Sequence, residues 1–267
     1  MIQELFNELS SFPEVEAIAL GGSRSQGNED EKSDYDIYIY LTSPLEGKKR
    51  ETFLSRYCRT REIGNHFWEL EDNCILNDGI DIDLIYRSLD EFAKDLSSVV
   101  HDCQPRNCYT TCMWHNLKTC QIIYDQNGRL AKLQKHYDVS YPRQLKKNII
   151  ENNMKLLRYG LPSFERQILK AAARQDFNSV NHRTAEFMAS YFDLLFALNE
   201  MSHPGEKRLV SICQKECSLL PEDFEENVDG LFKSLFVDSG KTAAFLNAMI
   251  ARLEELLEKE NLLPAKN

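Results

Sequence analysis

A glycine-rich turn followed by an Asp-x-Asp pair constrains the fold of this chain more than any other stretch. The apolar run at residues 15–20 leads into Gly21 and Gly22, and about a dozen residues later Asp34 and Asp36 stand at the head of a strand-like run. Residues i and i+2 of a β-strand point to the same face, so the two carboxylates are predicted to lie side by side. Two carboxylates held this close favour the binding of a divalent cation.

A second acidic run follows the turn Asn77-Asp78-Gly79, which is a signal for a β-hairpin. Residues 80–86 alternate apolar and acidic side chains up to residue 83, so Asp81 and Asp83 are predicted to share one face of a further strand. Either residue supplies a third carboxylate for the same cation site, and the alternation by itself leaves the choice between them open.

The apolar pattern changes after residue 137. Before that point strand-like and helical runs are mixed, whereas the later apolar residues recur with the period of a helix. The other elements predicted before the change are helices at 2–12, 48–59 and 88–100 and extended segments at 67–70, 74–76 and 121–125. We therefore predict an α+β protein with a mixed-sheet domain at residues 1–140 and an all-α helical bundle at residues 141–267.

Net charge limits the partners that suit this protein. The formal net charge is −10 and the pI is near 5.2. Proteins that bind nucleic acid usually present a basic face, so we expect no nucleic-acid partner and favour a neutral or cationic small substrate. The first ten residues lack the pattern of a signal peptide, and no apolar run approaches the roughly 20 residues that span a bilayer. We therefore expect a cytoplasmic protein without a membrane partner.

Half of the eight cysteines fall between residues 101 and 120, together with two histidines. The residues of this stretch are His101, Cys103, Cys108, Cys112, His115 and Cys120. Structural zinc sites usually draw their ligands from closely spaced pairs such as C-x2-C, and these spacings match no such pair. We expect reduced, inert thiols here, and a zinc site is the alternative.

The order of the glycine turn and the acidic strands along the chain resembles that of one known protein family. Neither the Gly-x-Gly-x-x-Gly pattern nor the Gly-x4-Gly-Lys-[Ser/Thr] pattern occurs, so the Rossmann and Walker signatures are absent. An apolar strand, Gly-Gly-Ser, Asp-x-Asp on a second strand and a later apolar-Asp-apolar strand together resemble the nucleotidyltransferase superfamily. This superfamily contains polymerase β, the aminoglycoside and lincosamide nucleotidyltransferases and small antitoxin-type proteins. The resemblance covers residues 14–87 by motif and the rest of the chain by architecture.

The resemblance implies a magnesium site built from three carboxylates. Asp34 and Asp36 would hold two Mg²⁺ ions, and Asp83 would hold the ion that activates the acceptor hydroxyl. Two such ions stabilise the attacking and the leaving oxygens when a nucleotidyl group is transferred. We favour Asp83 over Asp81 because the family places this acid inside an apolar-Asp-apolar strand, as in Ile82-Asp83-Leu84.

The resemblance also implies residues for the nucleotide. The backbone N–H groups of Gly21 and Gly22 would approach the triphosphate at a helix N-terminus, and the Ser23 hydroxyl would add a donor. Arg24 would pair with a phosphate oxygen, although a solvated surface arginine is an equal interpretation. In related two-domain enzymes a lysine of the C-terminal domain faces the triphosphate, and Lys207 is the candidate here. Its alternative is an exposed charge in a loop between helices.

These implications predict an enzyme that uses Mg²⁺ and ATP to transfer AMP to a hydroxyl group of a small molecule, with release of pyrophosphate. An aminoglycoside-like antibiotic is the first analogue for the acceptor, because a negatively charged cleft attracts a polycation. Two alternatives remain open. One is a non-catalytic or antitoxin-like binding protein that keeps the fold, and the other is an enzyme that attaches AMP to a protein.

Overall fold

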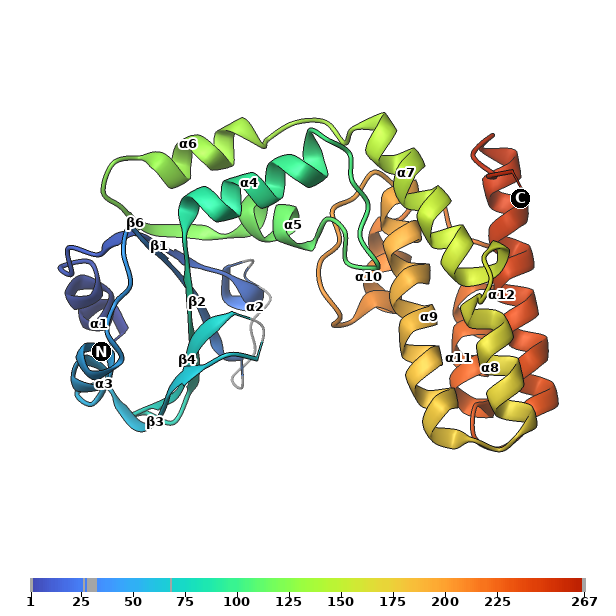
Figure 1. The fold of residues 1–267 in the computed structure, drawn as a ribbon, viewed down its shortest axis with the longest axis horizontal. Helices are drawn as coiled ribbons and strands as arrows, with labels where there is room; N and C mark the ends of the chain where they lie inside the picture. The colour runs from blue at the N-terminus through green and yellow to red at the C-terminus, as the bar shows by residue number, and fades with distance from the viewer. Residues whose placement is uncertain (1, 26, 28–32, 68, 266–267) are drawn as a thin grey trace. The chain divides into compact units, whose positions relative to one another are not determined.

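The structure is a computed structural model that describes residues 2–25, 27, 33–67 and 69–265. The chain forms two compact units (Figure 1). The first unit comprises Met1–Ser97 and Trp114–Val139, and the second comprises Ser98–Met113 and Ser140–Asn267. The segment 98–113 is therefore the part of the chain before residue 140 that belongs to the second unit. Of the turn between the first two strands, residues 26 and 28–32 lie outside the described residues.

The first unit is built on a mixed β-sheet, which within the described residues has the strand order β3-β4-β5-β2-β1-β6. Its strands are β1 Val15–Leu20, β2 Tyr35–Leu41, β3 Cys58–Asn65, β4 Leu70–Leu76, β5 Asp81–Arg87 and β6 Gln121–Asp125. The helices before residue 140 are α1 Ile2–Leu9, α2 Gly22–Ser25, α3 Gly47–Leu54, α4 Leu89–Val100, α5 Cys112–Thr119 and α6 Arg129–His136. Strands β2 and β5 are parallel, whereas the other neighbouring strands are antiparallel.

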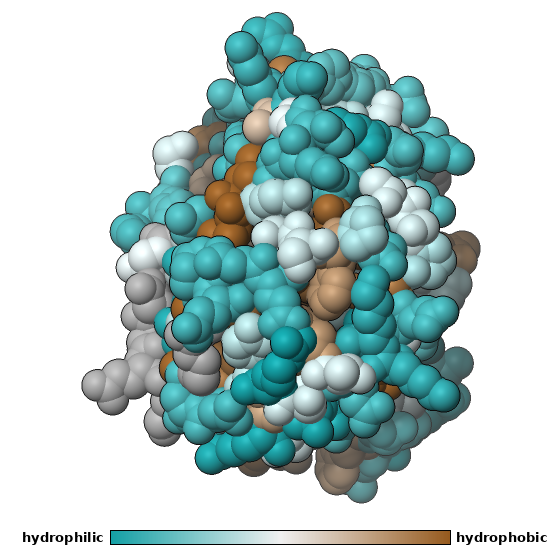
Figure 2. Space-filling view, turned by 90° about the vertical axis from the view of Figure 1, so that its left-hand side faces the viewer, coloured by the Kyte–Doolittle hydropathy of each residue, from teal (hydrophilic) through white to brown (hydrophobic). Residues whose placement is uncertain are grey.

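One face of this sheet is covered by α1 and α3 (Figure 1). Their apolar side chains form a closed core with alternate residues of the central strands, and full burial of each such side chain contributes roughly 1.5–3 kcal/mol. The core residues from these elements include Leu5, Phe6, Leu9, Ile37, Ile39, Phe53, Leu54, Ile82 and Leu84. The outer side of this layer is mainly hydrophilic, with small hydrophobic areas between (Figure 2).

The opposite face of the sheet carries the side chains that alternate with this core, among them Asp36, Tyr38 and Tyr40 of β2. The ring of Tyr40 lies 5.7 Å from the ring of Phe92 on α4. Arg87 of β5 is buried on this face, with its guanidinium 4.1 Å from the ring of Tyr38 and 5.2 Å from that of Phe92. This packing covers one part of the face and holds β2 and β5, the strands that carry the acidic residues, in place.

Helices alone form the second unit after residue 140. They are α7 Arg143–Met154, the π-helix η1 Lys155–Tyr159, α8 Phe164–Ala173, α9 Phe177–Leu198, α10 Leu209–Glu216, α11 Phe224–Ser234 and α12 Ser239–Lys259. Every residue from Ser190 to Leu198 is buried, which makes the end of α9 the centre of the packing. Asp176 and Asp238 cap α9 and α12, respectively. Each side chain accepts a hydrogen bond from the backbone N–H of the third residue of its helix.

A buried aspartate fixes the segment 98–113 within the second unit. The Asp193 carboxylate of α9 accepts hydrogen bonds from the backbone N and the hydroxyl of Thr110, both at 2.8 Å, and from Asn153 Nδ2 at 3.0 Å. Burial raises the pKa of the Asp193 carboxyl, while these hydrogen bonds act in the opposite direction. Because a buried carboxylate is costly unless it is hydrogen-bonded, the three donors determine where this segment lies.

The predicted α+β class, with a mixed sheet followed by a helical part, is confirmed. The helix predicted at 48–59 is wrong in its second half, since α3 ends at Leu54 and β3 begins at Cys58. The short helix α5 was not predicted, because its stretch was interpreted through its cysteines. Among the described residues, no helix is both long and apolar enough to cross a lipid bilayer.

Candidate active site

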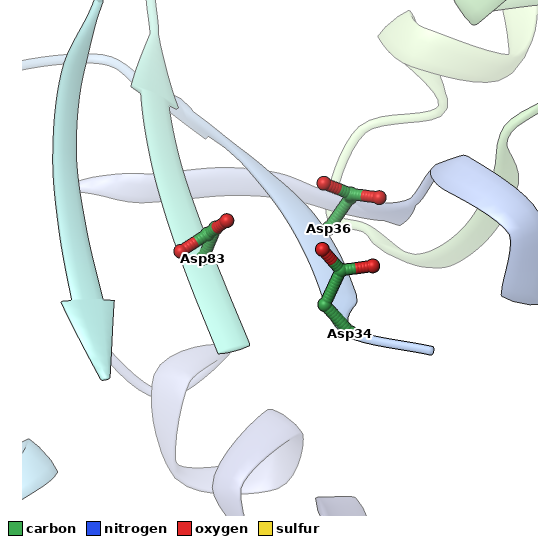
Figure 3. A group of neighbouring side chains, drawn as sticks. All are labelled: Asp34, Asp36 and Asp83. Atoms are coloured by element: carbon green, nitrogen blue, oxygen red, sulfur yellow. The ribbon is translucent and has the colours of Figure 1, made fainter. Parts of the chain in front are cut away.

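Three carboxylates meet where β2 and β5 begin. Asp34 directly precedes β2, Asp36 is the second residue of β2, and Asp83 is the third residue of β5. One oxygen from each carboxylate lies within 4.8 Å of the others, and all three residues are partly exposed (Figure 3). Short carboxylates that offer only hard oxygen ligands suit Mg²⁺, which keeps several waters and takes further ligands from substrate phosphates. The donor set therefore fits the predicted magnesium site.

Strand pairing places Asp83 beside Asp36, whereas Asp81 lies outside the group. β2 and β5 run parallel, and in their register Asp36 lies directly opposite Asp83. Asp81 is the first residue of β5 and is exposed, outside the group of three oxygens. The alternation that places both acids on one face holds, but the neighbouring strand carries a partner carboxylate at the level of residue 83.

The glycine turn is in contact with the same carboxylates. Gly21 donates its backbone N–H to the carbonyl oxygen of Asp36 at 2.8 Å, which extends the pairing of β1 with β2 by one residue. A Cβ atom on Gly22 would lie 1.9 Å from Asp36 Oδ2, and a Cβ atom on Gly21 would lie 2.3 Å from the ring of Tyr38. Glycine at both positions lets the turn approach the acidic strand, and Gly22 also has a φ of +63°.

Replacing Gly22 by alanine is expected to lower kcat by about a hundredfold, since displacing a reacting group by about 1 Å has this effect. The methyl group would push the Asp36 carboxylate from its place, and the positive φ would add about 1–2 kcal/mol of backbone strain. Pyrophosphate release measures the loss.

Gly27→Ala is the matched control for this experiment. Gly27 has a φ of +67° in the same turn, but none of the residues that the structure describes comes within 4 Å of the position of its Cβ. It therefore reports backbone strain without the clash. Equal losses in the two variants would contradict the assigned contact between Gly22 and Asp36.

Arg24 binds the backbone that leads into the acidic strand. Its guanidinium donates to the carbonyl oxygens of Ser33, at 2.6 and 3.0 Å, and of Asp34, at 3.1 Å, and it stacks over the ring of Tyr35 at 4.1 Å. The side chain thus joins α2 to the start of β2. These contacts give Arg24 a part in holding the main chain of Asp34, and its pairing with a phosphate oxygen stays a prediction.

The other two residues predicted to bind nucleotide are located as follows. Ser23 is the second residue of α2, a single helical turn of four residues, and is partly exposed. Lys207 is exposed in the loop before α10, in the second unit. Both stay predictions for the triphosphate.

Two polar residues of β4 complete the site and were missed by the sequence analysis. Asn73 lies directly opposite Asp83 and donates from Nδ2 to Asp83 Oδ1 at 2.8 Å. Glu71 lies two residues along on the same face and is buried; burial raises the pKa of its carboxyl, and the charge of Asp83 raises it further. The sequence feature that could have indicated both residues is the hairpin turn centred on Asp78, because it pairs residue 73 with residue 83 across the two strands.

The cysteine-rich stretch does not gather ligands in the part of the chain that the structure describes, where the only group of three or more potential ligands found is the acidic one. All eight cysteines are free thiols. Cys103 and Cys108 lie in the second unit and Cys120 in the first. Burial raises the pKa of the Cys108 and Cys120 thiols to about 11, which disfavours the thiolate that zinc requires.

Two family models match the chain, and their matched ranges meet within the segment 98–113. Residues 2–106 match the family model described as a nucleotidyltransferase domain, and residues 109–209 match one described as a domain of unknown function. No curated protein matches the chain.

Several solved structures resemble this one at low sequence identity. A nucleotidyltransferase-like protein from Exiguobacterium sibiricum is 13% identical with a TM-score of 0.45; the match covers 98% of this chain and 76% of that protein. An aminoglycoside 6-adenyltransferase from Bacillus subtilis is 11% identical with a TM-score of 0.27 and coverages of 99% and 98%. A CCA-adding enzyme solved with ATP is 12% identical with a TM-score of 0.28 and coverages of 97% and 82%. These TM-scores are too low to carry an argument.

The family match includes the glycine turn and all three acidic residues of the site. Residues 2–106 therefore match the nucleotidyltransferase domain family, in the part of the chain that carries the acidic strands.

Proposed function

We propose that this protein uses Mg²⁺ to transfer AMP from ATP to a hydroxyl group of a small molecule and releases pyrophosphate. The observation that carries the proposal is the group of Asp34, Asp36 and Asp83, whose oxygens lie within 4.8 Å of one another beside the glycine turn. Asp34 and Asp36 hold two metal ions, and Asp83 holds the one at the acceptor. When bound, these ions neutralise charge on the triphosphate and lower the pKa of the acceptor hydroxyl.

The order of the strands supports separate places for nucleotide and acceptor. Gly21 and Gly22 follow β1, on one side of Asp36, while Asp83 lies on the other side of β2. The triphosphate therefore lies along the glycine turn, where the backbone approaches closely and Ser23 supplies a hydroxyl. The acceptor lies beyond Asp83, towards β4.

A cationic acceptor is supported by the charges near Asp83. The three carboxylates of the site are partly exposed, and the chain as a whole carries a net charge of −10. Such a surface attracts a polycation such as an aminoglycoside and repels nucleic acid. We therefore propose an aminoglycoside-like antibiotic as the acceptor class and the cytoplasm as the place of action.

The test is Mg²⁺-dependent release of pyrophosphate from each of the four ribonucleoside triphosphates, with panels of aminoglycosides, lincosamides and a cell extract as acceptors. We expect release with ATP and one acceptor class, and its loss on addition of EDTA. Transfer of labelled AMP to a protein band in the extract would support the protein-modifying alternative. Absence of NTP binding in calorimetry with Mg²⁺ present would support the non-catalytic alternative and overturn the proposal.

A further inference from the structure

We infer that Asn73 is a positioning residue for Asp83, and that a β-bulge in the edge strand β3 sets its orientation. The inference rests on the proposed metal-dependent function. It starts from the hydrogen bond of 2.8 Å between Asn73 Nδ2 and Asp83 Oδ1, which joins two residues directly opposite each other on β4 and β5. A carboxylate only accepts hydrogen bonds, so the Asn73 amide must present its NH₂ group to Asp83.

This hydrogen bond makes one oxygen of Asp83 more available than the other to a metal ion. Oδ1 accepts this hydrogen bond with one of its lone pairs, so Oδ2 keeps both of its lone pairs for a metal ion. The three carboxylates of the site repel one another while no cation is bound, and the Asn73 donor favours one rotamer of Asp83 against that repulsion. The ligand is thus oriented before the metal ion arrives.

Asn65 fixes the orientation of the Asn73 amide. Asn65 Nδ2 donates to Asn73 Oδ1 at 2.7 Å and to Glu62 Oε2 at 3.2 Å. Since Asn65 offers a donor to Oδ1, turning the Asn73 amide over would set two NH₂ groups against each other. The chain of hydrogen bonds therefore runs from β3 through β4 to the acidic residue on β5.

A bulge at Gly64 is what brings Asn65 to the correct face. Glu62 pairs with Asn73, but the register between β3 and β4 shifts between Ile63 and Asn65. The extra residue is Gly64, with a φ of +81°. Without it, the alternation along the strand would turn residue 65 to the core face, where Ile63 packs.

Buried groups on the core face hold this bulge in place. Asp72 is fully buried, and its Oδ1 accepts hydrogen bonds from Gly64 N at 2.8 Å and from Arg50 Nη1 at 2.6 Å. Its Oδ2 accepts from the Tyr86 hydroxyl at 2.8 Å. Asp72 and Asn73 are neighbours on β4 and point to opposite faces of the sheet. Asp72 therefore holds the bulge from the core face, and Asn73 accepts the hydrogen bond from Asn65 on the face of the acidic site.

The experiment compares Asn73→Ala and Asn73→Leu with the wild-type protein. Asn73→Leu keeps the branched shape of the side chain and removes the donor without adding a charge beside Asp83, so a role in packing alone predicts near wild-type behaviour for it. We expect both variants to bind Mn²⁺, measured by electron paramagnetic resonance without nucleotide, about tenfold more weakly, the lower end of effects seen for groups that orient metal ligands. In pyrophosphate release we expect kcat to fall by about 10–100-fold while KM for the nucleotide changes far less.

Two further variants separate this role from a general loss of structure. Asn77→Ala is the matched control, because its side chain donates to the Arg56 carbonyl oxygen on the exposed hairpin turn, away from the site. Asn65→Ala keeps Asn73 but removes the hydrogen bond that fixes the orientation of its amide. We expect smaller losses of Mn²⁺ affinity and of kcat than in the Asn73 variants, and the same thermal unfolding temperature as in the control.

The outcomes also separate this inference from the proposed function. Wild-type Mn²⁺ binding and turnover that persist in both Asn73 variants would overturn the role of Asn73 and leave the transferase intact. A wild-type protein that binds Mn²⁺ but transfers no nucleotide would overturn the proposed reaction, and the binding measurement would still decide the role of Asn73. If the wild-type protein bound no Mn²⁺, both would be wrong.

Discussion

Replacing Asp36 by asparagine is expected to reduce kcat by at least about a thousandfold, which corresponds to about 4 kcal/mol of lost transition-state stabilisation. The change removes a negative charge from the position opposite Asp83 and keeps the volume of the side chain. Because Asp36 would help to hold the cations that neutralise the triphosphate, the loss of its charge is expected to weaken the whole site. Backbone pairing of β1, β2 and β5 involves no Asp36 side-chain atom, so the fold is expected to persist.

Pyrophosphate release with saturating Mg²⁺ and nucleotide measures this effect, and circular dichroism checks the fold. Asp81→Asn is the matched control, because Asp81 stands on the same strand face as Asp83 but is exposed and outside the acidic group. It should retain near wild-type turnover. Full activity of Asp36→Asn would show that the metal site has been assigned to the wrong residues.

Asp72→Ala is expected to lower the free energy of unfolding of the first unit by about 3–5 kcal/mol, the usual cost of removing one partner of a buried ion pair. Arg50 is almost fully buried beside it, with its guanidinium 4.7 Å from the ring of Tyr86. Without the carboxylate, this cation, the Tyr86 hydroxyl and the Gly64 N–H lose their partner at once. Each is a buried or half-buried polar group, for which a lost hydrogen bond is costly.

Urea unfolding followed by fluorescence measures the difference. The control is Glu14→Ala, which removes the partly exposed pair of Glu14 with Lys49 in the same unit, and for which a much smaller loss is expected because exposed ion pairs add little stability. A similar small loss for Asp72→Ala would mean that water replaces the carboxylate, and that the bulge at Gly64 is held by other contacts.

The sequence predicts that the three carboxylates lie together, because strand alternation and hairpin turns are local rules. Asp34 and Asp36 needed only the two-residue period, and Asp83 followed from the turn centred on Asp78. The preference for Asp83 over Asp81 came from family resemblance, and the parallel register of β2 and β5 places Asp83 directly opposite Asp36. That register joins strands more than 40 residues apart, and no local pattern encodes it.

Other features depend on contacts between distant segments. Arg24 was assigned to phosphate or to solvent, because nothing near it in sequence shows that the carbonyl groups of Ser33 and Asp34 fold back onto it. Strand β3 has few apolar residues because it lies at the edge of the sheet, so its pattern is weak. Asn73 was overlooked because an asparagine in a strand has no meaning until its cross-strand neighbour is known.

The anchoring of residues 98–113 by Asp193 affects how this protein can be divided. Cys103, Thr110 and Thr111 take hydrogen-bond partners from Asn148, Asp193 and the backbone of His203, all beyond residue 140. One family match ends at residue 106 and the other begins at residue 109, both inside this segment. A chimaera that joins the nucleotidyltransferase half of one relative to the helical half of another at a single junction would separate these partners. Residues 98–113 should instead be exchanged together with the helices that hold them.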